Sequence, residues 1–376
     1  MKTSRRDFLN ASLAGTAALA VTGAVGRPSA QQPAAPPGRV RFGVIGLNHS
    51  HINGQVETVR RSGGTLVSFF AKEPELAAAF AKRYPEARLA GNAQEILDDG
   101  SIQLILSAAI PNERAALGVE AMRHGKDFMS DKPGATTLEQ VAALRKAHAE
   151  TKRFFSVLIE RHESQVINKA AELVSAGAVG QVLQIIGMAP HRMSPETRPP
   201  WFFVREQYGG ILCDLASHNI DSFLFLTGST HVDIAAAQVG NLAHPQYPGL
   251  EDFGDVMLRG DRGLGYLRVD WFTPRGIQTF GDARLTILGS DGYMELRKNI
   301  DIAGRPGGGH LFLVDHKEAR HIDTGDVPLP YGQRLVDDVL NRTETADIQD
   351  RVFLALELGI EAENKATRVT ISPRRP

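Results

Sequence analysis

The chain has 376 residues, of which 42% are hydrophobic and 23% are charged, and its formal net charge is -1. This composition is typical of a globular chain of about two domains, and without a basic stripe of interleaved aromatic residues it argues against nucleic acid as a partner. Cys213 is the single cysteine, so an intrachain disulfide is excluded.

The first thirty residues read as an export signal. Ser4-Arg5-Arg6-Asp7-Phe8-Leu9 precedes an Ala- and Gly-rich apolar run over residues 13–25, which is the pattern of a twin-arginine signal peptide. The run is too short for a membrane helix, so we expect no stable membrane span. We predict a signal peptide over 1–30, a disordered linker over 31–38, the twin-arginine export machinery as a partner and a periplasmic location.

Residues 39–158 alternate between two patterns. Short apolar strands are expected at 40–46, 65–70, 102–107, 127–130 and 154–159, and amphipathic helices at 74–84, 112–125 and 136–150. Continuous apolar strands alternating with helices predict a doubly wound parallel sheet.

Residues 159–370 have a different character. After a helix at 164–176, strands joined by Gly, Asp and Pro turns are expected at 182–192, 231–240, 252–260, 263–274, 283–297 and 310–323. Clear helices are expected only near 214–227 and 331–365. This half is therefore predicted to be an α+β domain with a largely antiparallel sheet.

The turn after the first strand, Gly46-Leu47-Asn48-His49-Ser50-His51, resembles a dinucleotide-binding loop with two of its three glycines replaced. Asn48 tolerates positive φ better than most residues and is the expected stand-in for the second glycine. His51 replaces the third and would push the following helix outward. His49 and His51 could donate hydrogen bonds to phosphate, begin a metal site, or be ordinary loop histidines; with no carboxylate or cysteine partner in view, we expect no metal.

Two further stretches carry chemistry. Lys132 follows the fourth strand of the first domain, at the edge where ligands bind in parallel sheets, although a solvated surface lysine has the same pattern. In the second domain, Asp214, His218 and Asp221 have i, i+4 and i+7 spacing and would share one helix face. A carboxylate one turn before a histidine suits a general base, and a purely structural Asp-His pair is the alternative.

Three motifs in this order, IGLNHSH, DKP and GGILCDLASHNID, resemble the glucose-fructose oxidoreductase / inositol dehydrogenase / MocA (Gfo/Idh/MocA) family of nicotinamide-dependent oxidoreductases. The resemblance covers about residues 40–366. It implies an N-terminal Rossmann domain and a C-terminal substrate and oligomerisation domain with an open sheet, assembled as a dimer or tetramer. It also implies that Lys132 lies beside the nicotinamide, that Asp214 orients the substrate, and that His218 is the general base. Sugars, cyclitols and their derivatives are the expected substrates.

Cofactor and substrate residues follow from this resemblance. Gly46, Leu47, Asn48, His49, Lys72, Ser107 and Lys132 are the expected cofactor-binding residues, and Arg161, His191, Arg192, Trp201, Asp214 and His218 the expected substrate-binding ones.

The acid expected after the second strand is replaced by Ala71, followed by Lys72 and Glu73, which favours NADP while leaving NAD open. The resemblance and the export signal together suggest a tightly bound cofactor. Arg114 stands where the family usually has histidine. Glycoside cleavage or elimination on the same frame, through internal redox cycling or a metal, and non-catalytic sugar binding are the alternatives.

Overall fold

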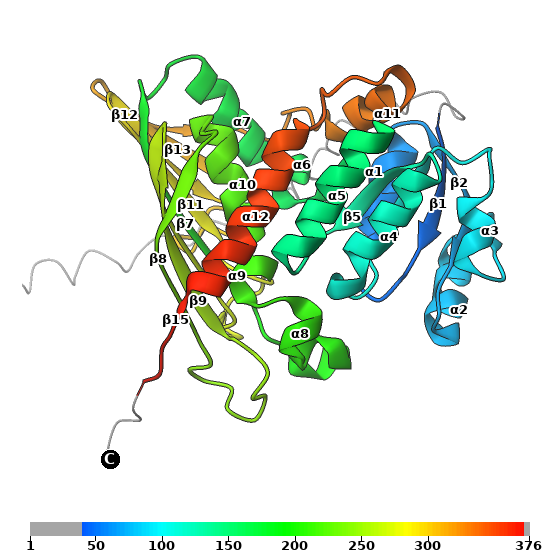
Figure 1. Ribbon diagram of the computed structural model, residues 1–376. Coiled ribbons are helices and arrows are strands. Elements are labelled where there is room, and N and C mark those ends of the chain that lie inside the picture. Colours follow the sequence, from blue (N-terminus) through cyan, green and yellow to red (C-terminus); the bar gives the residue numbers. More distant parts are fainter. Residues whose placement is uncertain (1–39, 372–376) are drawn as a thin grey trace, which may run out of the picture. The chain divides into compact units, whose positions relative to one another are not determined.

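A computed structural model describes residues 40–371 of the chain (Figure 1). The predicted signal peptide, 1–30, and linker, 31–38, lie outside the described residues.

The first domain is built on a six-stranded parallel sheet with strand order β3-β2-β1-β4-β5-β6. Its strands are β1 Val40–Ile45, β2 Gly64–Phe70, β3 Arg88–Leu89, β4 Leu104–Ser107, β5 Asp127–Asp131 and β6 Phe155–Leu158. Its helices are α1 Ile52–Arg61, α2 Pro74–Arg83, α3 Ala93–Leu97, α4 Pro111–Arg123 and α5 Leu138–Thr151. The predicted doubly wound parallel sheet is confirmed; β3 and α3 were not predicted because they are too short to show a periodic pattern.

The second domain carries a nine-stranded sheet with order β14-β13-β12-β11-β7-β10-β9-β8-β15. Its strands are β7 Val182–Pro190, β8 Val232–Gly240, β9 Phe253–Gly260, β10 Gly263–Asp270, β11 Arg284–Gly289, β12 Gly292–Arg297, β13 His310–Asp315, β14 Ala319–Ile322 and β15 Thr367–Arg368. Neighbouring strands are antiparallel except for β7 with β10 and β8 with β15. The predicted largely antiparallel sheet is therefore confirmed.

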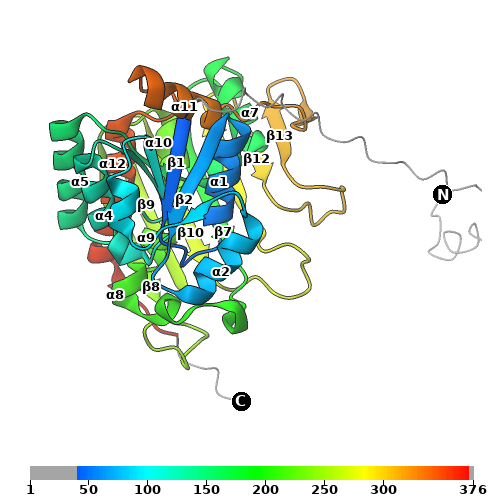
Figure 2. The ribbon, with the colours of Figure 1, turned by 90° about the vertical axis from the view of Figure 1, so that its right-hand side faces the viewer.

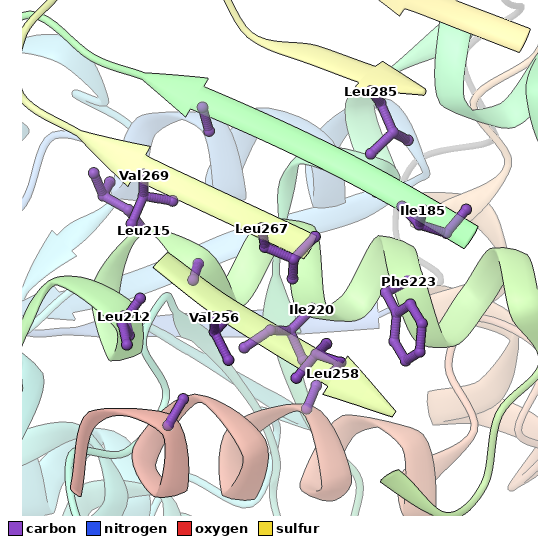
Figure 3. Close-up of a cluster of buried hydrophobic side chains, with 14 of the residues drawn as sticks. Ile185, Leu212, Leu215, Ile220, Phe223, Val256, Leu258, Leu267, Val269 and Leu285 are labelled. Atoms are coloured by element: carbon purple, nitrogen blue, oxygen red, sulfur yellow. The ribbon is translucent and has the colours of Figure 1, made fainter. Parts of the chain in front are cut away.

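The helices of this half of the chain are α6 Glu160–Glu163, α7 Gln165–Ser175, α8 Arg205–Tyr208, α9 Ile211–Asp214, α10 Ala216–Thr227, α11 Tyr331–Asn341 and α12 Gln349–Lys365, with 3₁₀ turns η1 Pro195–Thr197 and η2 Pro200–Phe203. Of these, α7, α9, α10 and α12 pack against the sheet. Figure 3 shows Ile220 and Phe223 of α10 packed against Val256, Leu258 and Leu267 of the sheet, all at most 2% exposed. This core fixes α10, and with it the segment that carries Asp214 and His218.

The predicted helix over 331–365 is two helices, α11 and α12. Arg342 ends α11 with φ of 59°, and Asp338 accepts hydrogen bonds from the following backbone at Thr345 and Ala346. The sequence pattern assigns both helices to the second domain, but α11 packs on the first domain, and α12 lies between the two and contacts both. Side chains of α11 join the apolar cluster of β1 and β2, and one side of α12 joins the cluster around α5 and β6. Figures 1 and 2 show α11 near α1 and β1.

Candidate active site

A cavity of about 460 Å³ lies where the carboxyl ends of the first domain's strands face the second domain. That volume is within the usual range for small-molecule sites. Its walls come from the β1–α1 turn, the ends of β5, β6 and β7, the η2 turn, the α9–α10 segment and the chain after β10. Among the predicted site residues, His49, Lys132, His191, Trp201, Asp214 and His218 line it.

Lys132 and Asp214 meet inside this cavity. The Lys132 Nζ lies 2.7 Å from Asp214 Oδ1, and the two residues are only 7% and 8% exposed. Eighty-two positions separate them in sequence. The structure therefore brings together the strand-end lysine and the acid of the glycine motif, which the sequence identifies separately.

The paired glycines of that motif have a steric cause. Gly209 and Gly210 have φ of 91° and 98°, and a Cβ on Gly210 would lie 2.2 Å from the Glu363 carboxyl carbon. Only glycine fits such a position. The Glu363 carboxylate accepts the Leu212 N–H at 2.9 Å, so it binds the start of α9, which carries Asp214.

Of the three residues predicted to share one helix face, Asp214 and His218 both line the cavity, whereas Asp221 is not among its lining residues. Asp214 pairs with Lys132, and Asp221 pairs with Arg161 at 2.6 Å. The backbone N–H of Glu160 donates to His218 Nδ1 at 3.1 Å. The neutral ring therefore carries its proton on Nε2, so His218 is a hydrogen-bond donor, and a general-base role would require this bond to break.

His191 has the opposite tautomer. Its Nδ1 donates to the Ala189 carbonyl at 2.9 Å, which leaves a lone pair on Nε2. Burial lowers the pKa of His191 to about 4, and burial together with the Lys132 charge holds the pKa of His218 well below its usual value. Both rings are neutral at pH 7, one as a donor and one as an acceptor. Such a pair suits a ligand with neighbouring hydroxyl groups.

A second polar group lies at the end of β5, around Asp131. His51 Nδ1 is 2.9 Å from Asp131 Oδ1, His49 Nδ1 is 3.1 Å from Oδ2, and Arg114 Nη2 is 3.1 Å from Oδ2. Burial would raise the pKa of Asp131, yet Arg114 and the two histidines hold it well below the ordinary value. Burial, opposed by Asp131, lowers the pKa of His49 to about 4.

Arg114, which stands where the family usually has histidine, has a structural role next to Asp131. The side chain is fully buried, its Nε donates to the Ala109 carbonyl at 2.7 Å, and its Nη1 donates to the carbonyls of Lys132 and Pro133. It thereby joins the turn after β4 to the turn after β5. Arg114 is a positioning residue for Lys132.

The β1–α1 turn keeps part of the dinucleotide-binding geometry. Gly46 has φ of 85°, and a Cβ there would lie 2.6 Å from that of Ala109. The first turn of α1 has no side-chain cap, but the N–H groups of Ile52 and Asn53 already donate to the carbonyls of His49 and Ser50, at 3.2 Å each, so a phosphate would meet the positive end of the helix dipole. The prediction for Asn48 was wrong: among the described non-glycine residues only Lys152, Ser194 and Arg342 have positive φ.

Asn48 and His51 instead use their side chains. Asn48 Nδ2 donates to Glu73 Oε1 at 2.7 Å, which holds that carboxylate beside the turn. His51 points to Asp131, and α1 still packs on the sheet through Ile52 and Val56, which are 3% and 0% exposed. These residues fit a dinucleotide: the positive end of the α1 dipole for phosphates and a fixed acid shortly after β2.

Lys72, the residue before Glu73, is exposed. Its Nζ is 3.1 Å from Glu113 Oε2 at the start of α4. The ion pair joins the ends of β2 and β4, and the lysine is free to exchange this partner for a phosphate. Both Glu73 and Lys72 therefore remain available for recognition of a ribose or its phosphate.

Three predicted site residues have structural roles. The Ser107 hydroxyl accepts the Ala109 N–H at 3.2 Å, and the side chain is fully buried. Arg161 is buried between Asp221 and Asp347, at 2.6 and 2.7 Å. Arg192 donates to carbonyls of residues 274–279. These three residues are not among those that line the cavity, and a residue at the end of a strand has the same sequence signal whether it enters the cavity or turns into the core.

Sequence reasoning missed part of the cavity wall. Arg198 stacks its guanidinium on Phe202, Trp271 and Phe280 at 4.6 to 5.7 Å, and all four line the cavity. An aromatic wall with a fixed cation is a surface on which sugar rings stack well. Nothing in the local sequence separates this arginine from its neighbours.

Two family models match the chain: the oxidoreductase family with an NAD-binding Rossmann fold over residues 40–159, and the GFO/IDH/MocA C-terminal domain over residues 167–295. The chain belongs to the GFO/IDH/MocA family. It is thus an oxidoreductase with an NAD-binding Rossmann domain, as predicted. Within residues 40–371, no helix combines the length and apolar character needed to cross a bilayer.

Solved structures and relatives of established activity are similar to the chain to different degrees. A solved structure from Erwinia carotovora atroseptica, provisionally classed as an oxidoreductase, has a TM-score of 0.86 and 40% identity, covering 88% of this chain and 99% of the other. Levoglucosan dehydrogenase of Pseudarthrobacter phenanthrenivorans is 27% identical over 52% of this chain and 51% of its own length. The NADP-dependent scyllo-inositol 2-dehydrogenase of Bacillus subtilis is 27% identical over 39% of this chain and 40% of its own. The chain thus spans about half of these two relatives or less.

Proposed function

We propose that this family member oxidises a carbinol carbon of a sugar, cyclitol or sugar derivative, or reduces the matching ketone, with NADP or NAD. The observation that carries the proposal is the buried Lys132–Asp214 pair, 2.7 Å apart, in a cavity that also contains His218 and His191. The named substrates of two relatives, levoglucosan and scyllo-inositol, belong to this chemical class.

Each side chain then has a defined task. Lys132, oriented by Asp214, exchanges a proton with the substrate oxygen, and the Nε2–H of His218 donates to the same oxygen. The alternative implied by the family resemblance makes His218 the base, at the expense of the Glu160 hydrogen bond. His191 accepts from a neighbouring hydroxyl, and the Arg198 wall supports the ring.

The β1–α1 turn would hold the cofactor, with Gly46 shaping the turn and the α1 N-terminus facing the phosphates. When bound, the nicotinamide supplies a site that accepts or returns hydride. The exposed Lys72 supports NADP as the preferred form, and the Asn48–Glu73 pair supports NAD as the alternative.

The test starts with the cofactor and ends with the lysine. The purified protein is denatured and its released nucleotide identified by mass spectrometry; turnover is then screened over sugars and cyclitols. Lys132→Met and His218→Asn should both retain folding and nucleotide, and Lys132→Met should lower kcat/KM by about 10² to 10⁴. Full activity in Lys132→Met would refute the proposal. If His218→Asn instead removes the acidic limb of the pH profile for oxidation, the base is His218.

We further propose export by the twin-arginine route to the periplasm and assembly of several copies. The Arg5-Arg6 pair before an apolar run supports export. Exposed Met257, Leu264, Leu288 and Tyr293, each 40–49% exposed, support assembly through the sheet face that helices leave free. Light scattering of the purified protein and fractionation of an Arg5→Lys, Arg6→Lys variant test these two statements.

A further inference from the structure

Two imidazoles converge on one carboxylate at the edge of the cavity. His49 and His51 both come from the β1–α1 turn, whereas Asp131 ends β5, two positions away in the sheet order β1-β4-β5. One ligand atom of each residue lies within 4.8 Å of the others. Two histidines and a carboxylate are donors that bind transition metals, and here the fold brings them to one point.

The ring of His49 lacks a partner for one nitrogen. Its Nδ1 is buried and makes no hydrogen bond to any described residue, although Asp131 Oδ2 is 3.1 Å away. This separation is short enough for a hydrogen bond, so it is the orientation of the His49 ring that prevents one. A buried polar atom left in this way is unfavourable, and a bound cation would satisfy it.

The donor separations match those around a metal ion. With bonds of about 2.1 Å, adjacent donors lie about 3.0 Å apart at octahedral angles and about 3.4 Å at tetrahedral ones. The two Nδ1 to carboxylate distances are 3.1 and 2.9 Å. These two distances end on different oxygens of Asp131, and the three donor atoms lie within 4.8 Å of one another, so side-chain rotations would bring them onto one ion.

Arg114 supports this cluster and narrows the choice of ion. Its guanidinium holds Asp131 Oδ2 at 3.1 Å and fixes the carboxylate, as outer partners of metal ligands do. The same charge offsets that of Asp131, which disfavours Mg²⁺ and Ca²⁺, because they depend on several anionic oxygens. Neutral imidazoles suit Zn²⁺, Co²⁺ or Ni²⁺.

We propose that His49, His51 and Asp131 form a binding site for one divalent transition-metal ion of the Zn²⁺ type, open toward the cavity next to Lys132. Three protein ligands leave at least one coordination position, which an oxygen of water or of a bound polyol takes. The site does not depend on the proposed hydride transfer.

The test is metal binding by the full chain, purified without a histidine tag and stripped with a chelator. Calorimetry with Zn²⁺ and visible absorption with Co²⁺ should each give one ion per chain. His51→Ala should weaken Zn²⁺ binding by at least about 100-fold, and its ring is 48% exposed, so the fold should tolerate the change. His321→Ala is the matched control, because His321 Nε2 also lies near another histidine, 3.4 Å from His310 Nδ1, and it should bind like the wild type.

His49→Gln, checked by circular dichroism, is the second variant and should lose binding as His51→Ala does. A folded wild-type protein that binds neither Zn²⁺ nor Co²⁺ at millimolar concentration would overturn the proposal. Wild-type affinity in both histidine variants would also overturn it. Nucleotide content, measured on the same preparations, separates the two proposals: metal without nucleotide contradicts only the proposed function, and nucleotide without metal contradicts only the metal site.

Discussion

Replacing Arg114 with methionine should destabilise the protein strongly. Methionine keeps an unbranched apolar stem but is shorter and cannot donate to the Asp131 carboxylate, which is 1% exposed, or to the carbonyls of Ala109 and Pro133. Removing one partner of a buried ion pair typically costs about 3–5 kcal/mol. Total stabilities are about 5–15 kcal/mol, so the loss should be easy to measure.

The loss should depend on pH in a defined direction. Burial raises the pKa of Asp131, and Arg114 is the largest of the effects that hold it well below the ordinary value. Without Arg114 the folded-state pKa rises above that of the unfolded chain, so the folded variant binds the proton more readily. Its deficit relative to the wild type should therefore be greatest at pH 7 and shrink as the pH falls toward about 4.

Urea unfolding followed by far-ultraviolet circular dichroism measures this effect. Asp131→Asn removes the charge, so adding it to Arg114→Met should cost less than the sum of the two single changes. A loss below about 1 kcal/mol for Arg114→Met at pH 7 would refute the reasoning, because it would mean that Asp131 is not buried as a charged group. Strict additivity would refute it as well.

Three further predictions concern other residues. The pKa of His191 falls from 6.5 to about 4 on folding, so the free energy of unfolding should drop as the pH falls through this interval. His191→Asn should remove about 2–3 kcal/mol of that drop. A variant whose stability depends on pH as the wild type's does would contradict the lowered pKa of His191. Burial and the charge of Glu251 raise the pKa of Glu363 from 4.5 to about 8, so the free energy of unfolding should fall as the pH rises across that range. Glu363→Gln should flatten this fall, and a variant less stable than the wild type at pH 9 would contradict the prediction. Lys72→Ala should weaken NADP binding about tenfold or more and spare NAD, measured by nucleotide fluorescence titration; equal loss for both would assign Lys72 no role with the 2′-phosphate.

The sequence predicts the fold well because both sheets obey simple periodicities. It also predicts Lys132 and Asp214, since each follows a local rule: the end of a parallel strand, and a glycine pair that begins a helix. The pairing of His51 with Asp131, eighty residues away, has no such local signal and depends on the order of strands in the sheet. The expectation of no metal rested on a missing carboxylate partner, and the fold supplies one.

The packing of α11 and of one side of α12 against the first domain affects the order in which the chain can fold during synthesis. Leu335 and Val336 are at most 3% exposed in the cluster beneath β1, and Phe353 is 1% exposed beside β6. A ribosome that has released residues 40–158 has therefore not yet supplied part of that domain's interior. The first domain should stay incomplete, with an apolar surface open to chaperones, until nearly two hundred further residues have emerged.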